Sequence, residues 1–260
     1  MIEIARPWAV AILAVTSAAT AYGQSGSTPP HHDAPDNGTD PTRLSRSATI
    51  TYEHTDLLEG YKRDLFRLEG IVPFGQKNDW SARVRVPVVS TDTTDDDGYG
   101  LGDASLQLSH VFGMTHKRGF VAQGEFTFDT AERDELGGGQ TIFKGTLIYA
   151  KFLEHGIFAP AFVQTLDVGG GSDRPDVRTT TIDFYYVPKL AGGKYVTFDP
   201  ALNYDWERNQ PYASLATTFG KVVGPAFGGH GQVYLKPSLQ MGPHRPSDWA
   251  IEVGYKVIGF

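Results

Sequence analysis

Apolar and polar residues alternate along much of the chain with a period of two, which is the pattern that a β-strand produces. Between residues 80 and 88, Trp80 and Val84 fall on one face of such a strand. Arg83 and Arg85 fall together on the other face, whereas in a helix they would interrupt the apolar stripe. The same alternation recurs at residues 103–112, 120–129, 196–206 and 249–257. These five segments predict strands with one apolar and one polar face.

Seven further segments show the pattern less cleanly, at residues 44–55, 61–72, 141–153, 157–167, 178–188, 213–222 and 230–239. Five and seven segments give about 12 strands, an even number, as a barrel needs when both termini lie on one side. Strands of about ten residues with an apolar face and an ionic face are typical of transmembrane barrels. We therefore predict an all-β fold, a transmembrane antiparallel up-and-down β-barrel of about 12 strands, over residues 44–260.

The connections between these segments alternate in length. The longer set comprises residues 90–102, 130–140, 168–177, 207–212 and 240–247, and the shorter set comprises residues 74–79, 113–118, 154–156, 189–193 and 223–229. Membrane barrels place short turns in the periplasm and longer loops outside the cell, so the longer set is expected outside. The first hairpin, Leu57 to Gly60, is short for an external loop.

Aromatic residues gather near the predicted strand ends, on the apolar face. One rim is expected to carry Trp80, Phe112, Phe120, Tyr149 and Tyr186, and the other Tyr52, Phe128, Trp206 and Trp249. Two aromatic girdles are expected of a membrane barrel. The alternative, a soluble β-sandwich, has to hide all these rings in one core while the opposite face stays polar, so we favour the membrane barrel.

The first residues of the chain differ from the rest. Arg6 precedes a short apolar run at residues 8–15, and small residues follow up to Gly23, which is the pattern of a secretory signal peptide at residues 1–23. Residues 24–43 are polar and rich in Pro, Gly and Asp, which predicts a disordered periplasmic tail. His31, His32 and Asp33 in this tail are a weak metal-binding candidate, and a solvated tail is the favoured interpretation.

Composition excludes several classes of protein. The 260 residues include no cysteine and carry a formal net charge of −7, which excludes a disulfide scaffold, thiolate metal sites and a strongly basic nucleic-acid binder. The 30 glycines and the 12% of aromatic residues suit many strands and turns better than helices. No cofactor is expected.

Strand parity assigns a set of polar side chains to the inside of the barrel. The candidate pore-lining residues are Arg63, Arg67, Glu69, Arg83, Arg85, Glu125, Lys144, Asp183, Tyr185, Tyr234, Lys236 and Glu252. The same parity places Asp103, Asp129, Asp199, Asp205 and Lys256 inside. Two interpretations stay open: a structural network of paired charges, which is favoured, and a cationic constriction of Arg67, Arg83 and Arg85 that selects anions. Together with Tyr185 and Tyr234, such arginines would suit an aromatic carboxylate or a phenolate.

Enzymatic motifs are weak. Some small membrane barrels act on lipids through Ser and His, but here Ser109 and His110 are adjacent and point to opposite faces of one strand. The glycine runs at 137–139 and 169–171 are not followed by Lys and Ser or Thr, so they do not predict phosphate loops. A lipid-modifying enzyme remains the alternative to a channel, and a structural barrel with a plugged lumen is a third.

Gly100-Leu101-Gly102-Asp103, leading into an alternating strand, resembles a motif of the outer-membrane family labelled the putative meta-pathway of phenol degradation. Phe198-Asp199-Pro200 and the closing strand from Trp249 support the resemblance, which covers residues 44–260. It implies an outer-membrane channel or transporter, with Gly100, Gly102 and Asp103 as family-motif residues. It says little about the solute.

The last residue, Phe260, is typical of outer-membrane barrels and is expected to be read by the barrel-assembly machinery. Its parity differs from that of the strand before it, so either a bulge near residues 257–259 restores the phase or Phe260 leaves the strand. The expected partners are outer-membrane lipid, the assembly machinery and a small-molecule solute, with no nucleic acid. The favoured function is a channel in the cell outer membrane that passes small solutes by passive diffusion.

Overall fold

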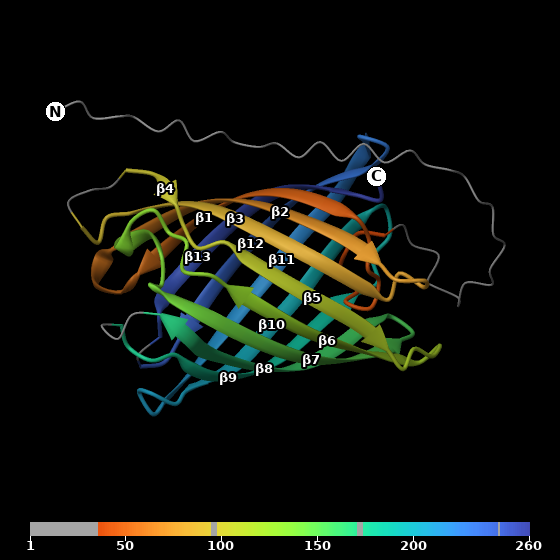
Figure 1. The fold of residues 1–260 in the computed structure, drawn as a ribbon. Coiled ribbons are helices and arrows are strands. Elements are labelled where there is room, and N and C mark those ends of the chain that lie inside the picture. The colour runs from red at the N-terminus through yellow and green to blue at the C-terminus, as the bar shows by residue number, and fades with distance from the viewer. Residues whose placement is uncertain (1–35, 95–97, 171–173, 244) are drawn as a thin grey trace. The chain divides into compact units, whose positions relative to one another are not determined.

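Antiparallel strands form a closed barrel in the computed structural model, which describes residues 36–94, 98–170, 174–243 and 245–260 (Figure 1). The signal peptide at residues 1–23 and the tail up to residue 35 lie outside the described residues. The strands are β1 (Ser47–Leu57), β2 (Lys62–Phe74), β3 (Trp80–Thr91), β4 (Gly100–Leu101), β5 (Ser105–Phe112), β6 (Arg118–Thr127), β7 (Gln140–Leu153), β8 (Gly156–Gly170), β9 (Arg178–Pro188), β10 (Lys194–Asp205), β11 (Gln210–Ala226), β12 (Gly229–Met241) and β13 (Ser247–Ile258). Two short 3₁₀ turns, η1 (Leu58–Gly60) and η2 (Asp134–Leu136), lie in loops. None of the described residues forms a helix long and apolar enough to cross a membrane.

Apart from the short strand β4, each strand pairs with the strands before and after it in sequence, and β1 pairs with β13 to close the ring. The two-residue strand β4 pairs with Val88 and Val89 in the C-terminal part of β3. Strand β5 pairs with residues 80–85 in the N-terminal part of β3. Thirteen strands less this short one leave a ring of twelve. The predicted up-and-down barrel of about 12 strands is therefore confirmed.

The two faces of the sheet have opposite chemistry. On the outer face, Leu68 and Leu202 are 61% and 60% exposed, and Phe126 is also exposed. On the inner face, Thr51 and Glu125 are only 2% and 3% exposed. A soluble sandwich would bury the apolar side and expose the polar side, so this barrel is inverted in the way that a lipid environment requires.

Aromatic rings gather at both ends of the outer face. Near the end where β1 begins and β13 ends, the ring of His110 stacks on Trp80 at 4.1 Å between centroids and also on Phe112 at 5.7 Å. The row continues on both sides through Phe74, Phe120 and Tyr149. At the other end, Trp249 contacts His54, Tyr52 contacts Phe66, and Tyr204 contacts Trp206. These contacts confirm rings at the predicted rims and add His110 to one of them.

The end of the barrel where β1 begins and β13 ends is called here the terminal end, and the opposite end is called the loop end. Short turns at the terminal end join β7 to β8 and β11 to β12, whereas the longer segments between β3 and β5 and between β6 and β7 lie at the loop end (Figure 1). The predicted alternation of loop lengths is therefore confirmed. The first hairpin is short at the loop end, where η1 forms a tight turn with Glu59 at a φ of 65°.

Several strands are longer than their sequence pattern indicated, because glycine and proline inside a strand resemble turn signals. The clearest case is β11, which continues through Gly224 and Pro225 to Ala226, beyond the predicted end at residue 222. Within the same strand, Gly220 lies under the ring of Tyr195, so that a methyl group at this position would overlap the ring. Gly254 in β13 makes the same room for Tyr234. These glycines therefore provide space for inward-facing tyrosines and do not end the strands.

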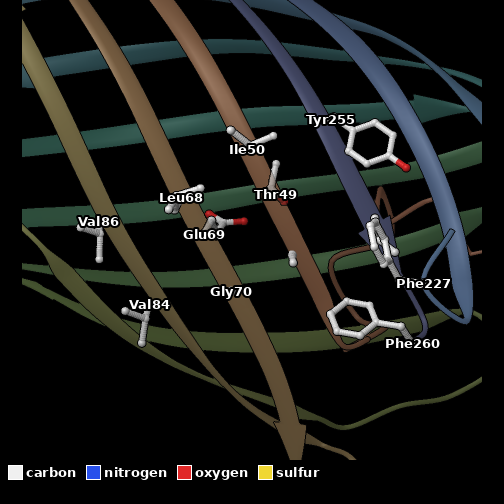
Figure 2. Close-up of a pocket in the computed structure, with 12 residues that line it drawn as sticks. Thr49, Ile50, Leu68, Glu69, Gly70, Val84, Val86, Phe227, Tyr255 and Phe260 are labelled. Atoms are coloured by element: carbon white, nitrogen blue, oxygen red, sulfur yellow. The ribbon is translucent and has the colours of Figure 1, made fainter. Parts of the chain in front are cut away.

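Phe260 does not continue β13, which ends at Ile258. Gly259 adopts a positive φ of 78°, which glycine tolerates at no steric cost, and the chain leaves the strand there. Of the two alternatives for the parity of Phe260, a bulge near residues 257–259 or departure from the strand, the structure shows that Phe260 leaves the strand. Figure 2 shows Phe260 beside Phe227, and both line an apolar groove on the outer wall with Leu68 and Gly70.

Candidate functional site

The lumen holds a set of ionised side chains on one side of the barrel, in two neighbouring ion-paired groups. We call this set the charge belt, and its members are Arg67, Glu69, Arg83, Arg85, Glu125, Lys144 and Glu252. They come from β2, β3, β6, β7 and β13 and share the inward face by register. The belt therefore follows the wall from β13 through β1 to β7.

Glu125 is the centre of the belt. Its Oε1 lies 2.5 Å from Nη1 of Arg85, and its Oε2 lies 3.0 Å from Nζ of Lys144 and 3.6 Å from Nη2 of Arg83. The glutamate side chain is almost fully buried by these neighbours. Charge-assisted hydrogen bonds of this kind are among the stronger polar contacts in proteins, so Glu125 ties β3 to β6 and β7.

Two more carboxylates extend the belt toward the barrel seam. Glu69 accepts a 2.8 Å hydrogen bond from Nε of Arg85 and lies 3.9 Å from Arg83. Glu252 of β13 accepts a 2.9 Å hydrogen bond from Nη2 of Arg67. Because each arginine of the belt has a carboxylate partner, the structural network predicted from sequence is present, and a bare ring of arginines is not.

The opposite wall of the lumen is built differently. Asp183 of β9 and Asp199 of β10 face inward on neighbouring strands, and one carboxyl oxygen of Asp183 is buried without a hydrogen-bond partner among the described residues. Tyr185 and Tyr234 also point inward, and the hydroxyl of Tyr234 lies 3.0 Å from that of Thr51. Lys236 also faces the lumen on this wall, next to Glu252 in register. This wall therefore lacks the dense pairing of the charge belt.

All twelve candidate pore-lining residues share the inward face that parity assigned to them. Arg63 lies near the start of β2, at the loop end, and its Nη2 is 3.6 Å from Oε1 of Glu53 in β1. Glu53 was not among the residues that the sequence analysis placed in the lumen. Asp199 and Lys256 also face the lumen. Asp205 lies at the end of β10, where it binds Arg208 at 2.8 Å. What sequence could not supply was the partner of each charge, because the pairs depend on strand register.

The segment from Asp36 to Arg46, called here the N-terminal segment, corrects the predicted boundary of the tail. Residues 36–43 were assigned to a disordered tail, yet Thr39 and Thr42 are 9% and 6% exposed, and Thr39 accepts a hydrogen bond through its carbonyl from the Tyr185 hydroxyl. Polar composition misled the prediction because the surface that receives this segment is itself polar. The Asx pattern of Asn37 and Thr39 is the signal that would have indicated a turn.

The N-terminal segment divides the terminal end of the lumen into two cavities. One, of about 240 Å³, lies between β9–β13 and β1–β2 and is lined by Tyr185, Lys236 and Arg67 among others. The second, of about 120 Å³, lies toward β1–β6 and includes Arg83. Gly38 and Lys256 line both cavities, so the segment and the inner wall at β13 lie between them.

Asp103 has a role that parity did not predict. Its Oδ1 accepts hydrogen bonds from the backbone N–H groups of Thr130 and Ala131, at 2.9 and 3.0 Å, and its Oδ2 accepts one from Gly138 at 2.6 Å. The loop after β6 is thereby fixed above β4, with Leu136 buried there. Gly100 leaves room for the side chain of Leu136, which would lie 2.6 Å from a Cβ at this position. A Cβ at Gly102 would lie 2.8 Å from Val89 of β3 and 3.1 Å from the Leu136 carbonyl oxygen. The family-motif residues are therefore a loop anchor at the loop end of the lumen.

We expect Asp103→Ala to release the loop at residues 128–139. Three backbone N–H groups would lose a charged acceptor, each such bond being worth about 1.5–3 kcal/mol. Limited proteolysis of the folded barrel should then cut within this loop at least tenfold faster than in the wild type. Asp129→Ala, a change at an exposed neighbouring carboxylate, is the control and should leave the cutting rate unchanged. Equal rates for both variants would contradict the anchor role.

Two serine and histidine pairs in the described part of the chain bear on the alternative of a lipid-modifying enzyme. Ser109 is buried on the inner face, whereas His110 stacks on Trp80 outside. Near the loop end, His54 Nδ1 lies 2.7 Å from Asp64, but Asp64 stands between His54 and Ser90 in register. A nucleophile and its base need to be within hydrogen-bond reach. Ser109 and His110 lie on opposite faces of β5, and the ring of His54 contacts Asp64.

Comparisons with known proteins agree with this architecture. The barrel is similar to the COG4313 outer membrane channel from Pseudomonas putida F1, with a TM-score of 0.70 and 10% sequence identity, over 87% of this chain and 100% of that one. It is also similar to the NanC porin, with a TM-score of 0.57 and 10% identity over 83% and 99% of the two chains. The KdgM porin gives a TM-score of 0.55 and 9% identity over 81% and 98%. No family model matches the sequence, and no curated protein matches it.

These similarities show the fold. The chain has the closed 12-strand barrel that is found in outer-membrane channels and porins. At 9–10% identity, the solutes of those proteins are not transferred to this one by likeness.

Proposed function

We propose that this protein is a passive channel in the bacterial outer membrane, which passes small hydrophilic solutes, including anionic and aromatic compounds. One observation carries the proposal: ionised residues line the inside of a closed barrel whose outside is apolar. A sheet that spans a membrane has to hydrogen-bond all of its backbone N–H and C=O groups, and a closed sheet does so. The width of a barrel of about 12 strands is intermediate between that of small filled barrels and that of wide porins.

The terminal end is proposed to face the periplasm and the loop end the cell exterior. The short turns lie at the terminal end and the longer loops at the opposite end, which is the usual arrangement of outer-membrane barrels. The aromatic rows at the two ends then lie at the two lipid interfaces. Strand β13 with Phe260 is proposed to be the signal for the barrel-assembly machinery.

The solute class follows from the lumen and is supported by one similar structure. Lys236 and Lys256 line the larger cavity, and neither forms an ion pair within 4.0 Å with a described residue. Tyr185, Tyr195 and Tyr234 supply hydroxyl groups and ring edges there. The KdgM porin has been solved in complex with oligogalacturonate, an acidic ligand. The relation to the family of the meta-pathway of phenol degradation is likewise a proposal, resting on the Gly100 to Asp103 motif.

Purified protein in planar lipid bilayers tests the proposal. We expect discrete current steps in KCl, and liposome-swelling assays should show entry of small acids such as benzoate and galacturonate. Protein that gives no current and no swelling under any condition would refute the channel. Turnover of phospholipid or lipopolysaccharide by the same preparation, abolished by His54→Ala or Ser90→Ala, would instead support a lipid-modifying enzyme.

A further inference from the structure

Exposed cations follow one another around the terminal end, on the part of the ring from β6 to β11. Backbone hydrogen bonds hold the turns and strand ends that carry them side by side: Phe152 N–H of β7 donates to the Lys117 carbonyl in the turn before β6, and Lys189 N–H in the turn after β9 donates to the His155 carbonyl in the turn after β7. We call this set of exposed residues the basic arc, and its members are Lys117, Arg118, Lys151, Lys189, Lys194 and Lys221.

The basic arc is strongly positive, although the whole chain carries a net charge of −7. The segments that form it, at residues 113–119, 150–158, 186–197 and 219–232, contain six cations and one acidic residue, Glu154, which gives 6 − 1 = +5. None of the six cations has an ion-pair partner within 4.0 Å among the described residues. The arc therefore differs from the charge belt, where each arginine has a carboxylate partner.

Four members of the arc form two like-charged pairs on neighbouring strands. Arg118 of β6 stands directly opposite Lys151 of β7, and Lys194 of β10 stands directly opposite Lys221 of β11. Residues in such positions have Cβ atoms about 4.5–5.5 Å apart, and like charges there destabilise a sheet. An anion bound between the members of each pair would replace this repulsion with charge-assisted hydrogen bonds.

Both pairs point out of the barrel, just beyond apolar rings of the outer face. The rings of Phe120 and Tyr149 contact each other on that face at 5.3 Å between centroids, and Arg118 and Lys151 follow them by two residues, about 6–7 Å further along the strands. The second pair follows the exposed Phe219 of β11 at the same spacing. Cations that flank an aromatic row in this way lie at the level of the lipid head groups.

We propose that the basic arc is a binding surface for anionic phospholipids, whose phosphate groups lie between Arg118 and Lys151 and between Lys194 and Lys221. A phosphodiester supplies the negative charge and the acceptor oxygens that these pairs lack, and its acyl chains pack on the apolar outer wall. The outward direction of both pairs favours a lipid over a soluble acidic partner, because the side chains point sideways into the lipid layer. The proposal goes beyond the channel function and does not depend on it.

Lipid that stays bound to the purified barrel tests the proposal. The full chain is reconstituted in vesicles with equal amounts of phosphatidylglycerol and phosphatidylcholine, extracted in a mild neutral detergent, and examined by native mass spectrometry. The wild type should retain several-fold more phosphatidylglycerol than phosphatidylcholine, and the variant R118Q/K151Q/K194Q/K221Q should retain the two lipids equally. The matched pair of variants is R118Q/K151Q, which should lose part of this preference, and K62Q/R178Q, which removes two exposed cations near the loop end and should keep it.

Urea unfolding separates loss of lipid binding from loss of the fold. In neutral detergent, R118Q/K151Q should unfold at a urea concentration no lower than that of the wild type, because a repulsive pair has been removed. Added phosphatidylglycerol should raise the midpoint of the wild type and leave that of the fourfold variant unchanged, since a ligand stabilises only the fold that binds it.

Three results would overturn the proposal. The wild type could retain both lipids equally, or the fourfold variant could keep the preference for phosphatidylglycerol. Millimolar inorganic phosphate could also displace the bound lipid from the wild type, which would assign the arc to a soluble anion instead.

Discussion

Replacing Glu125 with glutamine is expected to shift the channel strongly toward anions and to destabilise the barrel. The charge belt contains four cations, Arg67, Arg83, Arg85 and Lys144, and three carboxylates, Glu69, Glu125 and Glu252, so its net charge of 4 − 3 = +1 would become +2. Glutamine keeps the size of the side chain and removes only the charge. A cationic lumen favours anions at the constriction.

The stability effect follows from the three cations that Glu125 now contacts. Arg83, Arg85 and Lys144 would be left close together inside the wall, with only Glu69 to offset the two arginines. Removing one partner of a buried ion pair costs about 3–5 kcal/mol, because the remaining charge is uncompensated. The free energy of unfolding of the refolded barrel, measured by urea titration in detergent micelles, should fall by an amount in this range.

The double variant E125Q/K144Q is the matched control for this prediction. It removes one charge of each sign, so the reversal potential in a KCl gradient should return close to that of the wild type. Part of the lost stability should return as well, since contacting residues couple in a double-mutant cycle. If E125Q alone leaves both the reversal potential and the unfolding midpoint unchanged, Glu125 is not the centre of the belt.

Period two in the sequence was enough to predict the barrel and the direction of its side chains. The spacing of Arg83 and Arg85, or of Tyr234 and Lys236, keeps its meaning in any strand, because alternate residues share a face whatever the neighbouring strand is. Strand ends were less predictable where glycine and proline, such as Gly224 and Pro225 in β11, continue a strand instead of forming a turn. The face of the sheet to which a side chain points is therefore a local property that can be predicted from the sequence.

Charge pairing was not predictable in the same way. The partners Arg85 and Glu125 are 40 residues apart, and Arg67 and Glu252 are 185 residues apart. Their contact depends on the register of every strand pair between them, and a slip of one residue would reverse the faces. Sequence therefore shows that charges line the pore but not that each arginine has a carboxylate partner.

The N-terminal segment was missed for a different physical reason. Low hydropathy predicts disorder when the only available interior is an apolar core. In an inverted barrel the interior is polar, and Thr39 and Thr42 are buried there beside charged walls. A polar segment next to a predicted barrel strand therefore has to be considered for the lumen.

Replacing Arg83 and Arg85 together with alanine is expected to reverse the preference of the channel toward cations. The belt would keep Arg67 and Lys144 against Glu69, Glu125 and Glu252, so its net charge would change from +1 to 2 − 3 = −1. Loss of two long side chains from the inner wall should also raise the single-channel conductance. Both quantities are measured in one planar-bilayer experiment, as the reversal potential in a KCl gradient and the current step in symmetric salt.

The variant R83A/R85A/E69Q/E125Q separates charge from width. It removes two charges of each sign, which leaves Arg67 and Lys144 against Glu252 and restores a net charge of +1. Its reversal potential should therefore return toward the wild type, while its conductance stays high because the guanidinium groups are still absent. The reversal potential could instead be the same in the wild type, the double variant and the quadruple variant. That result would mean that ions do not pass along the charge belt, because ions that pass beside Glu125 have to respond when the net charge of the belt changes sign.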